Sequence, residues 1–149
     1  MDDNASGPDR AGPGKTSPSN VLGPMGRAHP RRVDKPWGYE LIWAETGRYV
    51  GKILHVRAGE ILSLQYHEEK DETLFLLEGE VRMWVGDDVE GLREVDLGRG
   101  ESYHIAPGTL HRMEAVQDAD ILEASTPELE DVVRLEDRYG RAPKPKVDG

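Results

Sequence analysis

The chain has 149 residues, a formal net charge of -10, a pI of about 4.9 and no cysteine. This acidity argues against nucleic acid or an anionic membrane surface as a partner, because both require clustered Lys and Arg. An anionic small molecule stays compatible, since a local basic pocket overrides the global field. The lack of cysteine excludes disulfides, thiolate metal ligands and a thiol nucleophile, and it fits a cytoplasmic protein. No stretch approaches the roughly 20 apolar residues of a membrane span, and we expect no signal peptide.

The two ends of the sequence differ in composition from its middle. Residues 1–32 are rich in Gly, Pro, Ser, Asp and Arg and hold few large apolar side chains, so they predict a disordered N-terminal tail. Residues 142–149 carry Pro and Lys and predict a flexible C-terminal tail. The folded domain is therefore expected over residues 33–141.

Short runs of β-branched and aromatic residues recur through the domain, separated by turn signals. The segment 78–80 predicts a hairpin between two such runs, and 117–120 predicts another turn. Many short strands at close, even spacing indicate an all-β sandwich or barrel. The predicted strands are 39–43, 49–56, 61–67, 73–77, 81–85, 92–97, 102–105, 111–116 and 121–124.

The last part of the domain has a helical pattern. It begins with a Ser at 125, an early Pro at 127 and a Glu at 128, as a capped helix does. An apolar stripe follows, formed by Leu129, Val132, Val133 and Leu135. We therefore predict a short C-terminal helical segment of one or two turns that ends near residue 140.

One group of residues suggests metal chemistry. Gln65 and His67 are two apart on a predicted strand, so their side chains point the same way. Glu72 begins the next apolar strand and is the member of the charged run 68–72 best placed to point inward, with Asp71 as the fallback. With His111 these residues offer nitrogen and oxygen donors, which suit Zn, Mn, Co, Ni or Fe(II). The alternative is that Gln65 and His67 are surface residues of a sandwich.

The spacing of these residues resembles the two motifs of the cupin superfamily. This resemblance implies a double-stranded β-helix, or jelly-roll barrel, that holds one divalent metal, zinc being the first choice and Mn, Co, Ni or Fe the others. The ligands it implies are Gln65, His67, Glu72 and His111. The residues that carry the resemblance are Gly59, Gln65, His67, Glu72 and Gly79 for the first motif, and Gly100, Pro107, Gly108 and His111 for the second.

A closer resemblance covers residues 33–141. The segments 35–39, 59–67 and 130–141 are similar to the isomerase domain of type II phosphomannose isomerases, a domain often fused to a mannose-1-phosphate guanylyltransferase. The resemblance implies metal-dependent aldose–ketose isomerisation of mannose 6-phosphate to fructose 6-phosphate. A base moves the proton between C2 and C1, and the metal stabilises the negative charge. A sugar or sugar phosphate would be the partner, and by analogy with small cupins we expect a homodimer.

The resemblance also offers residues for the remaining roles. Lys52 and Lys70 match basic positions, Lys70 standing where these isomerases commonly carry Arg. Arg138 and Arg141 match the terminal segment and would bring a guanidinium to the barrel mouth. His104 alternates with Ser102 and would line the cavity as a base. The structural alternatives are a surface lysine for Lys52, ion pairs for the two arginines and a structural histidine.

Three functions stay open on the sequence. The first is a sugar or sugar-phosphate isomerase or epimerase, favoured by Gln65 and the segment 130–141. The second is a metal-dependent oxygenase, and the third is a non-catalytic sugar-binding module. Lys70 and the acidic pair Glu68 and Glu69 favour a different substrate or the third function.

Overall fold

The computed structural model describes residues 25–143, and within this range the protein is all-β. Its first strand begins at residue 31, two residues before the expected domain boundary, and most of the predicted N-terminal tail lies outside the described range. Most of the predicted C-terminal tail lies outside it as well. The nine strands are β1 (Arg31–Lys35), β2 (Gly38–Glu45), β3 (Val50–Val56), β4 (Leu64–Tyr66), β5 (Glu72–Gly86), β6 (Arg93–Leu97), β7 (Ser102–Ile105), β8 (Leu110–Ser125) and β9 (Val133–Glu136).

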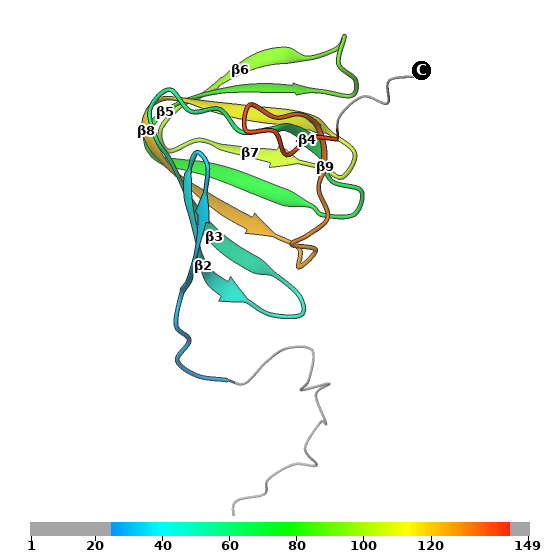
Figure 1. Ribbon diagram of the computed structural model, residues 1–149. Helices are drawn as coiled ribbons and strands as arrows, with labels where there is room; N and C mark the ends of the chain where they lie inside the picture. The colour runs from blue at the N-terminus through cyan, green and yellow to red at the C-terminus, as the bar shows by residue number, and fades with distance from the viewer. Residues whose placement is uncertain (1–24, 144–149) are drawn as a thin grey trace, which may run out of the picture.

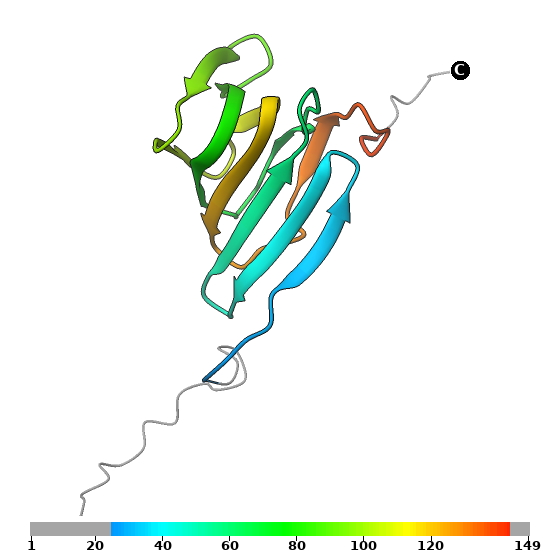
Figure 2. The same ribbon diagram turned by 90° about the vertical axis from the view of Figure 1, so that its left-hand side faces the viewer.

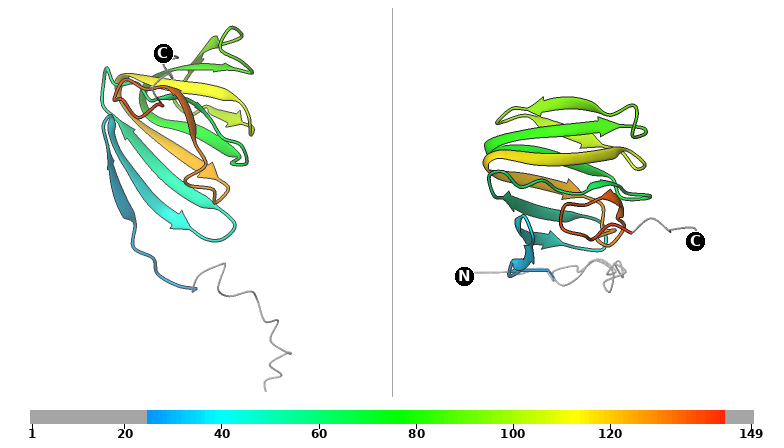
Figure 3. Two further views of the ribbon diagram at one scale, coloured as in Figure 1. Left: turned by 45° about the vertical axis from the view of Figure 1, so that its right-hand side comes forward. Right: turned by 45° about the horizontal axis from the view of Figure 1, so that its top comes forward.

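Two long antiparallel strands organise the sheet (Figure 1). β5 and β8 pair along almost their whole length, from Glu72 opposite Ser125 to Gly86 opposite Leu110. The pairing shifts register at three places between residues 76 and 81, and such bulges bend a strand and increase its twist. The paired strands therefore run from one layer of the curled sheet into the other (Figure 3).

The remaining strands complete the two layers. The C-terminal half of β8 continues through β3 and β2 to β1, while the N-terminal half of β5 pairs with β7. Figure 2 shows β1, β2 and β3 side by side in this layer. The second layer is made by β6, the C-terminal half of β5, the N-terminal half of β8, β4 and β9. This curled sheet confirms the all-β prediction.

Two predicted turns are wrong. The segments 78–80 and 117–120 are not hairpin ends, because they lie opposite each other inside the continuous strands β5 and β8. Gly79 has a φ of +94°, and a Cβ there would lie 2.2 Å from the carbonyl oxygen of Asp118. The turn-type residues therefore mark a bend where two backbones approach closely, which a local pattern does not distinguish from a hairpin.

The predicted C-terminal helix is also wrong. Residues 126–132 form tight turns, and Val133–Glu136 is strand β9, which pairs with β4. β-branched residues favour a pleated surface, and the free edge of β4 offers backbone groups that an isolated short helix would lack. In the described part of the chain no helix is long and apolar enough to cross a membrane.

The space between the layers is divided into a core and a cavity. Apolar side chains from both layers form the core, among them Val81, Met83 and Ile121, each no more than 3 % exposed. Trp37, Leu54, Leu74 and Met113 belong to this core and also line the cavity, so the cavity rests on rigid packed side chains.

Candidate functional site

The cavity brings together three of the four predicted metal ligands. His67 follows β4, Glu72 is the first residue of β5, and His111 is the second residue of β8. All three are at most 4 % exposed, and one potential ligand atom of each lies within 4.8 Å of the others. The cluster therefore joins both layers of the sheet and the connection between β4 and β5.

The separations within the cluster suit a small divalent ion. Oε1 of Glu72 lies 3.1 Å from Nε2 of His111 and 3.4 Å from Nε2 of His67. Two ligands about 2.1 Å from a tetrahedral zinc ion lie about 3.4 Å apart. The contact between His67 and Glu72 is close but lacks hydrogen-bond geometry, and Nε2 of His67 has no hydrogen-bond partner among residues 25–143. A buried nitrogen in this state fits a metal ligand.

Both imidazole rings are oriented from behind. Nδ1 of His67 donates to the carbonyl oxygen of Asp131 at 2.5 Å, and Nδ1 of His111 donates to that of Thr109 at 2.9 Å. With Nδ1 protonated, each Nε2 presents a lone pair to the cluster, which is the tautomer that metal binding requires.

Gln65, the fourth predicted ligand, lines the same cavity. It lies directly opposite His111 across β4 and β8, so the two side chains share a face. Its Oε1 accepts a hydrogen bond from the hydroxyl of Ser63 at 2.6 Å. The pattern that placed Ser63, Gln65 and His67 on the cavity face is confirmed.

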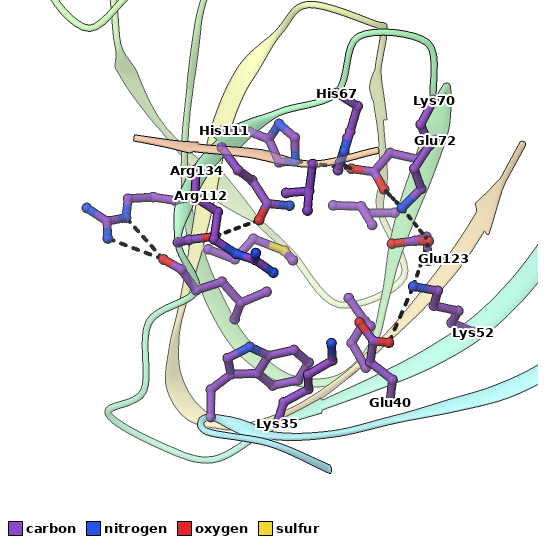
Figure 4. A pocket seen from close by; sticks show the side chains of 18 of the residues that line it. Lys35, Glu40, Lys52, His67, Lys70, Glu72, His111, Arg112, Glu123 and Arg134 are labelled. Carbon is purple, nitrogen blue, oxygen red and sulfur yellow. Dashed lines mark hydrogen bonds and ion pairs between the residues drawn. The ribbon is translucent and has the colours of Figure 1, made fainter. Parts of the chain in front are cut away.

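A buried chain of alternating charges extends from the cluster. Nζ of Lys70 lies 3.1 Å from both Glu72 and Glu123, and Nζ of Lys52 lies 3.9 Å from Glu123 and 3.4 Å from Glu40. Figure 4 shows these side chains following one wall of the cavity. Lys52 and Lys70 are 5 % and 4 % exposed, so the surface-lysine alternative is wrong for Lys52.

The charges of this chain shift one another's pKa values. Burial disfavours the charged form of Lys70, but the carboxylates of Glu123 and Glu72 outweigh it and raise the pKa of this lysine. Burial also opposes ionisation of Glu72, yet His111, His67 and Lys70 hold its pKa well below the usual value. The pKa of Glu123 is raised, by burial and by the charge of Glu72. The cavity thus holds a fixed ammonium between two carboxylates of different basicity.

Two predicted residues lie outside the cavity. His104 is 60 % exposed at its side chain and bonds Asp71 at 2.5 Å, so the prediction that it lines the cavity is wrong. Both Ser102 and His104 point outward on β7. Arg138 is half exposed and donates to the carbonyl oxygen of Gly59 at 2.8 Å, while Arg141 does line the cavity.

The segment after β8 supplies contacts that strand patterns did not indicate. The carboxylate of Asp131 accepts hydrogen bonds from the backbone N–H groups of Glu68, Glu69 and Lys70 at 3.1, 2.7 and 2.9 Å. These bonds, those from Glu69 and Lys70 most, lower the pKa of Asp131. Asp131 therefore holds both the loop after His67 and the His67 ring.

Five further charged residues line the cavity and were missed as site residues. Their polar side chains alternate with apolar ones along strands, but a solvent-facing strand gives the same pattern. Of the cavity-lining residues in the described range, six are cationic and three are carboxylates, which leaves a positive excess of three in an acidic protein. The residues missed are Lys35, Glu40, Arg112, Glu123 and Arg134.

Comparisons with known proteins identify relatives of this site. The model of a cupin domain matches residues 52–124. The chain is 36 % identical over 117 residues to mannose-1-phosphate guanylyltransferase ManC of Salmonella typhimurium, covering 74 % of this chain and 23 % of that protein. It is 35 % identical over 121 residues to mannose-1-phosphate guanylyltransferase of Escherichia coli, covering 77 % and 24 %. The chain thus spans about a quarter of the length of these relatives.

A solved structure supports the fold independently. KdgF from Halomonas sp. superposes with a TM-score of 0.57 at 17 % identity, covering 68 % of this chain and 91 % of that one. At this identity the likeness concerns the arrangement of strands alone.

Proposed function

We propose that this chain, which belongs to the cupin family, is a metal-dependent aldose–ketose isomerase that interconverts mannose 6-phosphate and fructose 6-phosphate. The observation that carries the proposal is the buried cluster of His67, Glu72 and His111, with one imidazole nitrogen left without a partner beside a cation-rich cavity. The relatives named as mannose-1-phosphate guanylyltransferases support it, because the family resemblance places such isomerase domains in fusions with that enzyme.

The cluster and Gln65 are the proposed metal site. A divalent ion bound there supplies a Lewis acid, which stabilises negative charge on the sugar oxygens. Two imidazoles, a carboxylate and an amide oxygen suit zinc and several other divalent ions. We propose one ion per chain and zinc as the first to test.

The ionic chain beside the cluster is proposed to handle the proton. Aldose–ketose isomerisation requires a group that takes the proton from C2 and returns it to C1. Glu123 lines the cavity, lies 3.1 Å from the ammonium of Lys70 and makes no contact with His67 or His111 of the kind Glu72 makes. It is the proposed base, and Lys70, whose pKa is raised, is proposed to stay charged beside it.

Three variants test these assignments together. His67→Ala and Glu72→Gln should each lower the metal content to a small fraction of one ion per chain, because each removes a ligand from a three-residue cluster. Glu123→Gln should retain the metal and lose about 100-fold or more of the turnover. Elemental analysis measures the first outcome, and NMR detection of fructose 6-phosphate measures the second.

The contrary outcomes are equally definite. Full metal occupancy in both ligand variants would falsify the site. Unchanged turnover in Glu123→Gln would place the proton transfer elsewhere. Tight sugar binding without turnover in the metal-loaded protein would favour a binding module, and oxygen consumption by an iron-loaded sample would favour an oxygenase.

The cytoplasmic location and the homodimer stay predictions. The free edges of β1 and β6 offer unpaired backbone groups for an isologous contact. Light scattering of the purified chain measures the oligomeric state.

A further inference from the structure

The cations that line the cavity are not equally neutralised by the protein. Lys52 and Lys70 are paired within the buried ionic chain. Arg112 donates through Nε and Nη2 to the carbonyl oxygen of Leu62 and through Nη1 to Glu136. These three side chains are therefore committed to contacts inside the protein.

Lys35 and Arg134 differ from them. Neither side chain forms an ion pair or a side-chain hydrogen bond with any residue between 25 and 143, and Nε of Arg134 is buried without a partner. A buried cation without a counter-charge costs folding free energy, so its presence at a cavity wall indicates a ligand. Because the cavity opens beside both side chains, this ligand would be an anion.

A third cation lies with these two. Arg141 lines the cavity and bonds Asp137 through Nε at 2.8 Å and Nη2 at 3.0 Å, which leaves Nη1 outside that pair. The proximity of the three is evident in their electrostatics. Burial and the charges of Arg141 and Arg134 lower the pKa of Lys35, against the pull of Glu40, and burial and Arg141 lower the pKa of Arg134.

The three cations are separated from the metal cluster. Figure 4 shows Lys35 across the cavity from His67 and His111. Lys35 ends β1, Arg134 belongs to β9, and Arg141 follows β9, so the group forms only where the C-terminal segment returns against the sheet. A ligand with an anionic group at one end and a reacting group at the other would span the cavity between them.

We propose that Lys35, Arg134 and Arg141 form a subsite for the phosphate group of a phosphorylated substrate. The planar fork of Arg suits a phosphate oxygen pair, and an ammonium adds a third donor. The inference rests on the proposed function only for what happens at the metal end of the substrate. Anion binding at this subsite requires neither the metal nor turnover.

Calorimetric titration of the full chain with orthophosphate, after metal removal by a chelator, tests the subsite directly. Arg134→Gln and Lys35→Gln should each weaken phosphate binding by about tenfold or more, since each removes a charged hydrogen bond. Arg134→Lys should bind with intermediate affinity, because it keeps the charge and loses the fork. Mannose, which carries no charge, should not compete with phosphate at this subsite.

Arg82→Gln is the matched control. Arg82 lies on β5 outside the cavity and pairs with Glu94 at 3.0 Å, and its replacement changes the net charge by the same amount. Its phosphate affinity should stay within about twofold of the parent chain, because only the long-range field changes. An equal loss in Arg82→Gln and Arg134→Gln would overturn the subsite, and so would a metal-free parent chain that does not bind phosphate.

Thermal unfolding separates this role from a structural one. Without phosphate, Arg134→Gln should melt no lower than the parent chain, because it removes an uncompensated buried charge. A lower Tm with unchanged phosphate affinity would assign Arg134 to the fold and refute the proposal. Weakened phosphate binding in the two cavity variants, without isomerisation by the parent chain, would support the subsite and refute the proposed reaction.

Discussion

At the scale of single residues, Asp131 links the metal cluster to the C-terminal segment. Its carbonyl oxygen accepts the Nδ1–H of His67, and its carboxylate accepts three backbone N–H groups from residues 68–70. Residues behind metal ligands fix the ring orientation and contribute to metal affinity without touching the ion. Asp131 is a positioning residue in this sense.

Replacing this carboxylate should weaken metal binding without removing a ligand. Asp131→Asn is expected to lower metal affinity by about tenfold or more, because the amide supplies a weaker acceptor to the loop that carries His67. Competition with a chromophoric chelator measures the affinity. Glu130→Gln, an exposed neighbour with the same change of charge, is the control and should leave it unchanged. Equal affinities in Asp131→Asn and the parent chain would refute the positioning role.

At the scale of elements, the bend shared by β5 and β8 lets one strand pair serve both layers. The N-terminal half of β5 carries Glu72 and the N-terminal half of β8 carries His111, and these two residues meet because the layers face each other. The close crossing at Gly79 fixes where the bend falls. Without it the paired strands would extend as one flat ribbon and the cluster would not form.

Substitution at Gly79 should therefore destabilise the fold more than substitution at a similar glycine in open space. A Cβ at Gly79 would lie 2.2 Å from the Asp118 carbonyl oxygen and 2.7 Å from the Cα of Ala119, whereas at Gly100, with a φ of +84°, it would meet no atom within 4 Å. Gly100→Ala should cost about 1–2 kcal/mol of unfolding free energy from backbone strain alone, and Gly79→Ala about 3 kcal/mol or more. Urea unfolding measures both, and equal losses would show that the close approach is not tight.

At the scale of the whole molecule, the proposed metal site joins parts that are far apart in sequence. The cluster draws on the segment after β4, on β5 and on β8, and β9 holds the same region through its pairing with β4. A ligand that binds only the folded chain stabilises it by mass action. The stability of the molecule should therefore depend on metal.

Metal addition should raise the Tm of the chelator-treated chain. A free metal concentration of 100 times the Kd adds about 2.7 kcal/mol to the unfolding free energy. In His111→Ala this increment should disappear, whereas His104→Ala should retain it, because His104 is exposed outside the cavity. Differential scanning calorimetry measures the shift. A metal-induced rise of the same size in His111→Ala would show that the ion binds elsewhere.

The sequence alone determined what depends on local periodicity and on residue chemistry. Alternation along a strand was sufficient to place Ser63, Gln65 and His67 on the cavity face, because side chains two apart on a strand always share a face. The donor types and their spacing were sufficient to predict the cluster of His67, Glu72 and His111. The all-β class followed from strand-forming runs and turn signals.

Only the tertiary structure decided how those local signals are used. The glycine at 79 reads as a hairpin in a short window and is a bend because β8 crosses it. The apolar stripe from 129 to 135 reads as a helix and is a strand because the edge of β4 accepts it. Lys35 and Arg134 read as surface cations, and their burial at one cavity follows from contacts between the first and last strands. Such contacts join residues about 100 positions apart, and chain periodicity carries no information over that distance.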